Sequence, residues 1–463
     1  MNIILLSGGS GKRLWPLSNE VRSKQFLQLL PVEGGGRQSM VQRIYSQIGS
    51  TVPDASVTVA TCESQVDSIR SQLEDGVEIV TEPERRDTFP AICLAAAYLA
   101  LVKGRSLDEV AVVLPADMYT DGEYFRTLKK LEGAVRKGCG DIALMGIVPT
   151  EPSSKYGYIV PKGIAVNDIY HVERFTEKPV PETAKELIAD GAVWNGGVFA
   201  FRLRYVLNIL RKALPFETYG ELLSRYGELE KISFDYRVVE RAKNVVMVPY
   251  SGEWKDLGTW DALVEKMENT SMGNCRLSGC RNTHVINELD IPVVAIDVKN
   301  IILAASADGI LVSDSSSSGK LKDCIADLKQ RPMYEERRWG SYRVLDYTVR
   351  NGRDISLTKQ MNIRIGKNIS YQVHRKRDEV WTVVEGSGEL LLDGKLEYVF
   401  PGSVIHILRG QKHAIRAITD LNLIEVQLGD ELEEEDIVRY NYDWPVGRGD
   451  WFESVRREIQ ALA

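Results

Sequence analysis

The sequence lacks any apolar run approaching the ~20 residues that a membrane-spanning helix requires. It also lacks an excess of basic residues, because 58 Lys and Arg stand against 65 Asp and Glu, giving a formal net charge of −7. Nucleic-acid-binding proteins usually carry a basic footprint, so we expect neither nucleic acid nor a membrane as a partner. The apolar stretch at the N-terminus is short and has no positive residues before it, which argues against a signal peptide.

Cysteine is sparse, with six residues scattered along the chain. Only Cys275 and Cys280 are close together, and no second pair completes a zinc site. Free thiols in a reducing, cytoplasmic compartment are therefore expected. The 44% hydrophobic and 27% charged content is typical of a soluble globular protein, and 463 residues predict two or three domains.

Up to about residue 262, apolar runs alternate with amphipathic stretches. This alternation predicts an α/β domain, with a Rossmann-like, mostly parallel mixed sheet covered by helices on both faces. Strands are expected at 2–6, 56–61, 77–80, 110–114, 142–147 and 245–249, and helices over 38–48, 63–74, 90–103 and 123–137.

The rest of the chain is richer in strands. Residues 270–314 hold short strands with no room for helices, and the SSSSG segment at 315–319 predicts a flexible break before a helix over 320–330. From residue 339 onward, alternating strands are separated by glycine turns. We predict three domains, at residues 1–265, 266–330 and 331–463.

The first strand breaks directly into a glycine turn, and three cations follow it. They are Gly8, Gly9 and Gly11, then Lys12, Arg13 and Lys24. Glycines let backbone N–H groups approach an anion closely, and Lys and Arg neutralise its charge. The turn therefore predicts a nucleoside triphosphate site, although a tight turn with surface cations is the simpler reading of glycines alone.

Two aspartates follow apolar strands in loops that are distant along the chain. Asp117 ends VAVVLPAD, and Asp256 lies in GEWKDLGTW. Either one alone more often caps a turn, but two carboxylates at the carboxyl edge of a sheet are suited to one Mg²⁺.

Three further turns offer groups for a sugar phosphate. YGYI contains Gly157, which allows close approach to a hydroxyl, and WNGGVF contains Asn195. FTEKP presents Glu177 to accept hydroxyl hydrogen bonds and Lys178 to hold a phosphate before a proline that fixes the turn.

The C-terminal strands carry candidate metal ligands, namely Gln372, His374, Glu379 and His413. Gln372 and His374 are two residues apart, so they face the same side of a strand. Imidazole, carboxylate and amide donors suit Zn²⁺ or another divalent first-row metal. His406 is expected to be structural.

These motifs resemble one family. GGSGKRLWP followed by KQF resembles the signature of sugar-phosphate nucleotidyltransferases, and PAD with WxDxGxW resembles their two metal motifs. YGYI, EKP, WNGG and EPERRDTFPAI resemble motifs of the mannose-1-phosphate guanylyltransferases, which places Arg86, Asp87 and Thr88 in the nucleotide loop. QVHRKRDEVW resembles the cupin of the bifunctional mannose-6-phosphate isomerases.

The resemblance implies a nucleotidyltransferase domain, a short left-handed β-helix at about 270–314 that mediates a homodimer, and a C-terminal cupin barrel. It implies Mg²⁺-dependent transfer of GMP from GTP to mannose 1-phosphate, with Arg13, Lys24 and Lys178 as catalytic residues. It also implies isomerisation of fructose 6-phosphate and mannose 6-phosphate, with Arg377 stabilising enediolate-like charge.

Several positions depart from the family pattern. Asp87, Phe89 and Met118 lie near the expected nucleotide, so another nucleoside triphosphate or hexose 1-phosphate remains an alternative. Arg375, Lys376 and Val380 replace histidines around the cupin ligands. A regulatory protein that binds nucleotide sugars without catalysis, with an inactive cupin, is the other alternative, although such a protein would not need both metal carboxylates.

Overall fold

The computed structural model describes residues 1–9, 11–32, 34–73, 76–267, 269–350, 354–433 and 436–444. Ser10 of the glycine turn and the part of the predicted third domain beyond residue 444 lie outside the described residues. The chain divides into a first unit, Met1–Ala304 with Leu311–Asp327, and a second unit, Ala305–Ile310 with the chain from Leu328 onward. No helix among the described residues has both the length and the apolar character needed to cross a membrane.

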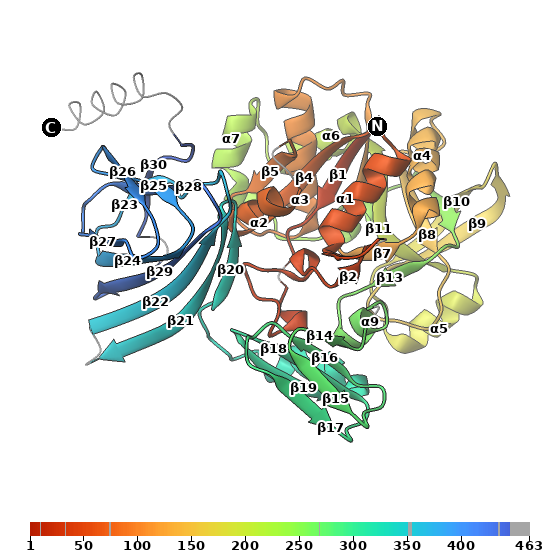
Figure 1. Ribbon diagram of the computed structural model, residues 1–463. Helices are drawn as coiled ribbons and strands as arrows, with labels where there is room; N and C mark the ends of the chain where they lie inside the picture. Colours follow the sequence, from red (N-terminus) through yellow and green to blue (C-terminus); the bar gives the residue numbers. More distant parts are fainter. Residues whose placement is uncertain are drawn as a thin grey trace. The chain divides into compact units, whose positions relative to one another are not determined.

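The first unit is built on a nine-stranded mixed sheet (Figure 1). Its strands are β1 (Asn2–Leu6), β4 (Ser56–Cys62), β5 (Glu78–Glu82), β6 (Val110–Pro115), β8 (Ile142–Ile147), β9 (Tyr158–Val166), β10 (Ile169–Thr176), β11 (Val193–Arg202) and β12 (Val245–Tyr250). Their order is β5-β4-β1-β6-β11-β8-β12-β10-β9. Strands β5, β4, β1 and β6 are parallel, whereas β11 runs antiparallel to both β6 and β8. The predicted α/β class and mixed sheet are confirmed.

Helices cover both faces of this sheet, because alternate residues of each buried strand point to opposite sides. Ile3 and Leu5 belong to one apolar core, and Ile4 belongs to the other. The first core includes side chains from α1 (Met40–Thr51), α2 (Val66–Gln72), α4 (Gly122–Arg136) and α5 (Pro181–Ala189). The second includes side chains from α3 (Thr88–Ala97), α6 (Leu203–Ala213), α7 (Tyr219–Ser224) and α8 (Phe234–Arg237).

Short strands follow the sheet, as expected. They are β14 (Ser271–Met272), β15 (Cys275–Ser278), β16 (His284–Asn287), β17 (Val293–Ile296), β18 (Ile301–Ser306) and β19 (Gly309–Asp314). β14 pairs in parallel with β16, and β15 pairs in parallel with β17. Ile286 and Ile302 share an apolar cluster with Leu14 and Leu17 from beside the glycine turn. The element therefore packs against the segment that flanks the predicted phosphate site.

The expected flexible break at 315–319 is wrong. Ser315–Lys320 forms a 3₁₀ helix capped by Asp314. Ser318 is buried, and its hydroxyl donates to Asp261 Oδ1 at 2.8 Å, so a polar contact within the first unit orders the serines. The predicted helix over 320–330 is also too long, because α10 spans only Leu321–Cys324.

The second unit contains two antiparallel sheets. One has the order β20 (Tyr334–Arg337), β21 (Gly340–Arg350), β22 (Asp354–Ile363), β29 (Leu421–Gly429), β24 (Arg377–Glu385) and β27 (Val404–Ile407). The other has the order β26 (Lys395–Val399), β25 (Gly388–Leu392), β28 (His413–Ala417), β23 (Tyr371–Val373) and β30 (Val438–Asn441). Trp381 and Leu423 from one sheet share a core with Leu390 and Ile415 from the other, so the two sheets pack face to face.

Candidate functional site

The glycine turn lies at the carboxyl edge of the parallel strands. A Cβ atom on Gly11 would lie 2.5 Å from Cα of Ser23 and 2.6 Å from the backbone nitrogen of Lys24. Only glycine therefore lets the Lys24 segment pack against the turn. Around Gly9, a Cβ atom would meet nothing within 4 Å, which leaves open space beside the backbone. This geometry suits the approach of a phosphate to backbone N–H groups.

Lys24 bridges the two predicted magnesium ligands. Its Nζ lies 2.8 Å from Asp117 Oδ2 and 3.0 Å from Asp256 Oδ1. The two loops meet because β7 (Met118–Thr120) pairs with β13 (Trp254–Asp256), with Asp256 opposite Met118. Burial opposes the charge on Lys24, but the two carboxylates outweigh that effect and raise its pKa.

This donor set fits Mg²⁺. The two carboxylates converge on one cation, the Lys24 ammonium group. Both carboxylates are partly exposed, so substrate oxygens and water can reach them. Gly258 keeps the space open, because a Cβ there would lie 2.9 Å from Asp256 Oδ1 and 3.0 Å from Lys24 Nζ.

The other predicted cations of the loop lie apart from this cluster. Arg13 is exposed on a 3₁₀ turn, and within the described chain its side chain forms no hydrogen bond or ion pair. Lys12 is also exposed and pairs with Glu20 at 2.8 Å. Arg13 is therefore free to meet a ligand, but the structure does not bring it to Lys24.

The predicted sugar-binding residues do come together. The backbone N–H of Asn195 donates to Gly157 O at 2.8 Å, and Lys178 Nζ lies 2.8 Å from Glu177 Oε1. A Cβ on Gly157 would lie 2.5 Å from Glu177 Oε2. Gly157, Glu177, Lys178 and Asn195 thus form one polar cluster.

Asp235 is a member of this cluster that sequence reasoning missed. Asn195 Nδ2 donates to Asp235 Oδ1 at 2.7 Å. Burial, followed by the nearby Glu177 carboxylate, raises the pKa of Asp235 to about 7. In the sequence, Asp235 resembles an ordinary first-turn aspartate after the helix cap Ser233, so no local signal marked it.

The raised pKa predicts a pH-dependent stability. The ordinary pKa of Asp235 is 3.8, so between about pH 4 and 7 the folded chain keeps a proton that the unfolded chain has lost. Stability contributed by this group therefore falls as the pH rises through that window. Asp235→Asn should reduce the loss of unfolding free energy between about pH 5 and 7.5 by at least ~1 kcal/mol, measured by urea titration of tryptophan fluorescence. The exposed Asp190→Asn is the control; equal pH slopes for Asp235→Asn and wild type would contradict the assignment.

The predicted nucleotide loop is braced by backbone contacts. Asp87 has φ 69° and caps α3 by accepting from the Thr88 N–H at 2.7 Å. With ψ −177° this backbone lies outside the left-handed α region that Asp and Asn tolerate, so Asp87 holds a strained conformation at the start of α3. Thr88 Oγ1 accepts from Phe234 N at 2.8 Å, and Arg86 donates to Leu229 O at 2.7 Å.

Phe89 and Met118, the two other first-unit residues that depart from the family pattern, are buried. Phe89 lies in the core of the second face, and Met118 is also buried. Glu82 is a further candidate residue that the sequence motifs did not indicate. It is a buried carboxylate beside Gly8 and accepts a hydrogen bond from Tyr226 OH at 2.7 Å. Burial raises its pKa, partly offset by the Tyr226 hydrogen bond.

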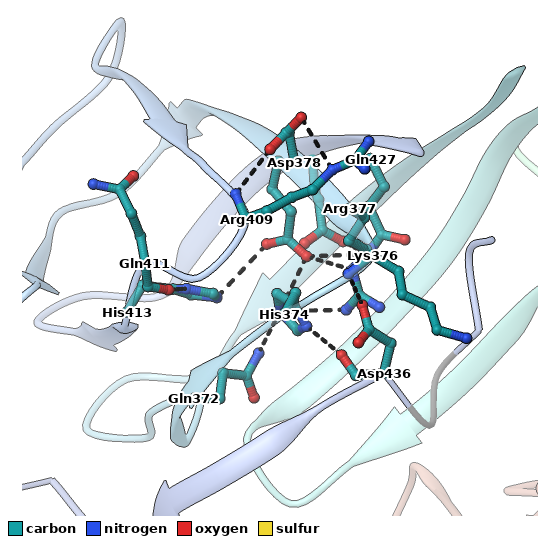
Figure 2. Close-up of polar contacts among 12 residues, drawn as sticks. Gln372, His374, Lys376, Arg377, Asp378, Arg409, Gln411, His413, Gln427 and Asp436 are labelled. Atoms are coloured by element: carbon teal, nitrogen blue, oxygen red, sulfur yellow. Dashed lines mark hydrogen bonds and ion pairs between the residues drawn. The ribbon is translucent and has the colours of Figure 1, made fainter. Parts of the chain in front are cut away.

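In the second unit, His374, Glu379 and His413 point toward one another, as Figure 2 shows for the histidines. Their candidate ligand atoms all lie within 4.8 Å of one another. Glu379 Oε1 is 3.2 Å from His374 Nε2, and Glu379 Oε2 is 3.7 Å from His413 Nε2. Gln372 is adjacent, with Nε2 3.3 Å from His374 Nε2. The four predicted ligands are thus brought together.

The histidines are oriented as metal ligands require. His374 Nδ1 lies 2.7 Å from Asp436 O, and His413 Nδ1 lies 3.0 Å from Gln411 O, so each Nε2 is left as an acceptor facing the cluster. His413 Nε2 is buried and has no hydrogen-bond partner among the described residues. Burial is the main cause that lowers the pKa of His374 to about 3 and of His413 to about 4, so both are neutral near pH 7. The donors fit Zn²⁺ or a related divalent ion.

Arg377 lies inside this cluster. Its Nε donates to Glu379 Oε1 at 2.8 Å, and its Nη2 is 3.3 Å from His374 Nε2. The neighbouring Arg375 and Lys376 are exposed. The backbone N–H of Arg375 donates to the Asp436 carboxylate at 3.1 Å, and that of Lys376 donates to it at 2.9 Å; Figure 2 shows Lys376 beside Asp436. Two of the family departures are therefore outside the buried cluster. His406 is exposed and is not part of it.

Glu425 and Gln427 complete the cluster. Trp381 Nε1 donates to both Glu379 Oε2 (3.2 Å) and Glu425 Oε1 (3.1 Å). Gln427 Nε2 donates to Glu425 Oε2 at 3.1 Å, and burial, with the Glu379 carboxylate, raises the pKa of Glu425 to about 7. A signal existed in the sequence, since both residues occupy inward positions of the alternating strand LNLIEVQL.

Comparison with known proteins gives consistent matches for both units. Residues 2–272 match the family model of nucleotidyl transferases, and residues 327–442 match that of the mannose-6-phosphate isomerase C-terminal domain. The chain is 31% identical to a xanthan biosynthesis protein, XanB, of Xanthomonas campestris pv. campestris, over 94% of this chain and 97% of that protein. It is 30% identical to a mannose-1-phosphate guanylyltransferase of Salmonella montevideo, over 95% and 98%. A crystal structure from Thermus thermophilus, named a mannose-1-phosphate geranyltransferase, is 32% identical with a TM-score of 0.60, covering 71% of this chain and 99% of that one.

Proposed function

Because the chain belongs to the mannose-1-phosphate guanylyltransferase family of nucleotidyltransferases, we propose that it transfers GMP from GTP to mannose 1-phosphate. The products are GDP-mannose and pyrophosphate. The observation that carries the proposal is the convergence of Lys24, Asp117 and Asp256 beside the glycine turn. A cation between two carboxylates next to open backbone is suited to a metal-bound triphosphate.

Aromatic side chains join this cluster to the sugar cluster. Tyr156, beside Gly157, has its ring centroid 5.2 Å from that of Trp254 and 4.8 Å from that of Trp194. Trp254 precedes Asp256 by two residues, and Trp194 precedes Asn195. Both substrates can therefore bind on one continuous surface of the first unit.

The transfer depends on alignment of the attacking phosphate with the α-phosphorus and does not need a general base. A 1-phosphate oxygen is already anionic, so it attacks the α-phosphorus directly; the new oxygen–phosphorus bond forms as the bond to the leaving pyrophosphate breaks. Lys178 holds the attacking phosphate, while Lys24, Arg13 and the N–H groups of the glycine turn stabilise the charge that develops. Mg²⁺ held by Asp117 and Asp256 would neutralise triphosphate charge.

The specificity for guanine and mannose is part of this proposal. The buried Glu82 carboxylate is an acceptor beside the glycine turn, and guanine offers neighbouring N–H donors that such a group can bind. Other nucleoside triphosphate and hexose 1-phosphate pairs are the alternative. A screen of five nucleoside triphosphates against several hexose 1-phosphates, read by pyrophosphate release, should give GTP with mannose 1-phosphate the highest kcat/KM. Another preferred pair would refute this specificity.

Sugar recognition is assigned to Glu177 and Asn195, which predicts a separable effect. Glu177→Ala removes a buried acceptor next to Gly157, so the preference for mannose over glucose 1-phosphate should fall by about 10-fold at fixed GTP. The KM for GTP should stay within about 2-fold. Kinetic profiles with both sugars test this; an unchanged sugar preference together with lost GTP binding would refute the assignment.

We also propose that the C-terminal domain is a cupin barrel with a second activity, because its buried histidine cluster fits a metal ion. The activity is isomerisation of fructose 6-phosphate and mannose 6-phosphate, in which a proton moves between adjacent carbons. Zn²⁺ or a related divalent ion would polarise the sugar oxygens when bound by His374, Glu379 and His413. Arg377, 3.3 Å from His374 Nε2, can stabilise the enediolate-like charge.

The assembly completes the proposal. The proposed enzyme is cytoplasmic and forms a homodimer through a left-handed β-helix of residues 270–314. The homodimer is supported by apolar side chains that this element exposes. Val294 and Ile296 on β17 are 59% and 63% exposed. Apolar exposure of this kind commonly marks an interface.

A further inference from the structure

A two-point ion pair joins the short strands of the first unit to the loop that carries Lys24. Arg22 Nη1 lies 2.8 Å from Glu288 Oε2, and Arg22 Nη2 lies 3.0 Å from Glu288 Oε1. The Arg22 side chain is 10% exposed and that of Glu288 is 22% exposed. Two parallel N–H···O bonds fix orientation as well as charge, which a single contact does not.

Each of residues 22–25 forms a side-chain hydrogen bond or ion pair with another part of the first unit. Arg22 binds Glu288, and Lys24 binds Asp117 and Asp256. The Ser23 hydroxyl donates to Gly9 O at 2.9 Å, and Gln25 Nε2 donates to Ser7 O at 3.1 Å. This segment therefore sets both the position of Lys24 and that of the glycine turn.

Glu288 is the member of this set that comes from the short strands after the nine-stranded sheet. It directly follows β16, whose Ile286 packs with Leu14 and Leu17 beside the glycine turn. The apolar cluster holds the two elements together, and the ion pair sets the orientation of the loop.

We propose that Glu288 is a positioning residue for nucleotidyl transfer, acting through Arg22 to hold Lys24 in place. The inference rests on the proposed function of the same site. Glu288 does not touch substrate; its effect is on the geometry of the cation that faces the triphosphate. A displacement of about 1 Å at such a group can cost up to ~100-fold in rate.

The test measures pyrophosphate release from GTP and mannose 1-phosphate by the full chain. Glu288→Ala and Arg22→Lys should each lower kcat by about 10-fold or more, with the KM for GTP within about 3-fold. The reciprocal variant, Arg22→Glu with Glu288→Arg, should recover part of the lost kcat. The matched control is Glu132→Ala, which should leave kcat unchanged. The Glu132 side chain is 16% exposed and pairs with Arg136 at 2.7 Å on α4.

The outcomes separate the two claims. An active wild type with an equally active Glu288→Ala would overturn the inference and leave the proposed function intact. A loss of kcat that the reciprocal variant does not restore, accompanied by a lowered Tm, would indicate a structural role only and would also overturn it. A wild type that releases no pyrophosphate with any substrate pair would refute the proposed function itself.

Discussion

Replacing Asp256 by asparagine should lower the kcat for pyrophosphate release by on the order of hundreds-fold, the scale expected for losing a preorganised charge. Asp256 contacts Lys24 at 3.0 Å and is one of the two carboxylates available to Mg²⁺. The amide keeps the size of the side chain but not its charge. Steady-state kinetics at saturating Mg²⁺, GTP and mannose 1-phosphate measure the effect.

The matched control for this variant lies in the same loop. Glu253 is an exposed carboxylate that pairs with Lys266 on the surface, so Glu253→Gln should retain wild-type turnover. Near wild-type activity of Asp256→Asn would show that the acidic pair is not part of the catalytic site.

The second large effect is expected in the C-terminal domain. His413→Ala removes one of three convergent donors, a neutral imidazole whose Nε2 faces the cluster and has no hydrogen-bond partner among the described residues. Affinity for Zn²⁺ or Co²⁺ should fall by on the order of 100-fold or more, because changes to groups that merely support a ligand already cost ~10–100-fold. Metal analysis after equilibrium dialysis measures the change.

His406 provides the control, because it is an exposed histidine of the same unit outside the cluster. His406→Ala should bind metal like the wild type and should match it in an assay of fructose 6-phosphate to mannose 6-phosphate conversion. Wild-type protein that binds no metal at all would refute the metal centre. Metal binding without isomerisation would refute the second activity and leave the metal centre in place.

Local patterns were sufficient for much of the fold. The apolar runs at 2–6 and 142–147 are β1 and β8, because a short continuous apolar run is typical of a strand that is buried on both faces. The prediction of a flexible break at the serine segment is wrong because the structure there depends on a distant residue. Ser318 contacts Asp261, which lies 57 positions away in the sequence. Composition alone cannot report such a tertiary contact.

The site shows the same division. The glycine turn and both aspartates were visible as motifs, but their convergence depends on the pairing of β7 with β13. Asp235 could not be found, because its role arises from packing against Asn195. Glu425 could have been found, since a charged residue at an inward position of an apolar strand is unusual and indicates a buried polar network.

The most direct test of the proposed guanylyltransferase activity is a product balance with purified protein, Mg²⁺, GTP and mannose 1-phosphate. Guanylyl transfer to mannose 1-phosphate predicts one pyrophosphate and one GDP-mannose for each GTP consumed, with no pyrophosphate when either the sugar phosphate or Mg²⁺ is omitted. GTP binding without any turnover would contradict it and favour a nucleotide-binding regulatory protein. Pyrophosphate release independent of the sugar phosphate would contradict it equally, because the attacking oxygen would then not come from mannose 1-phosphate.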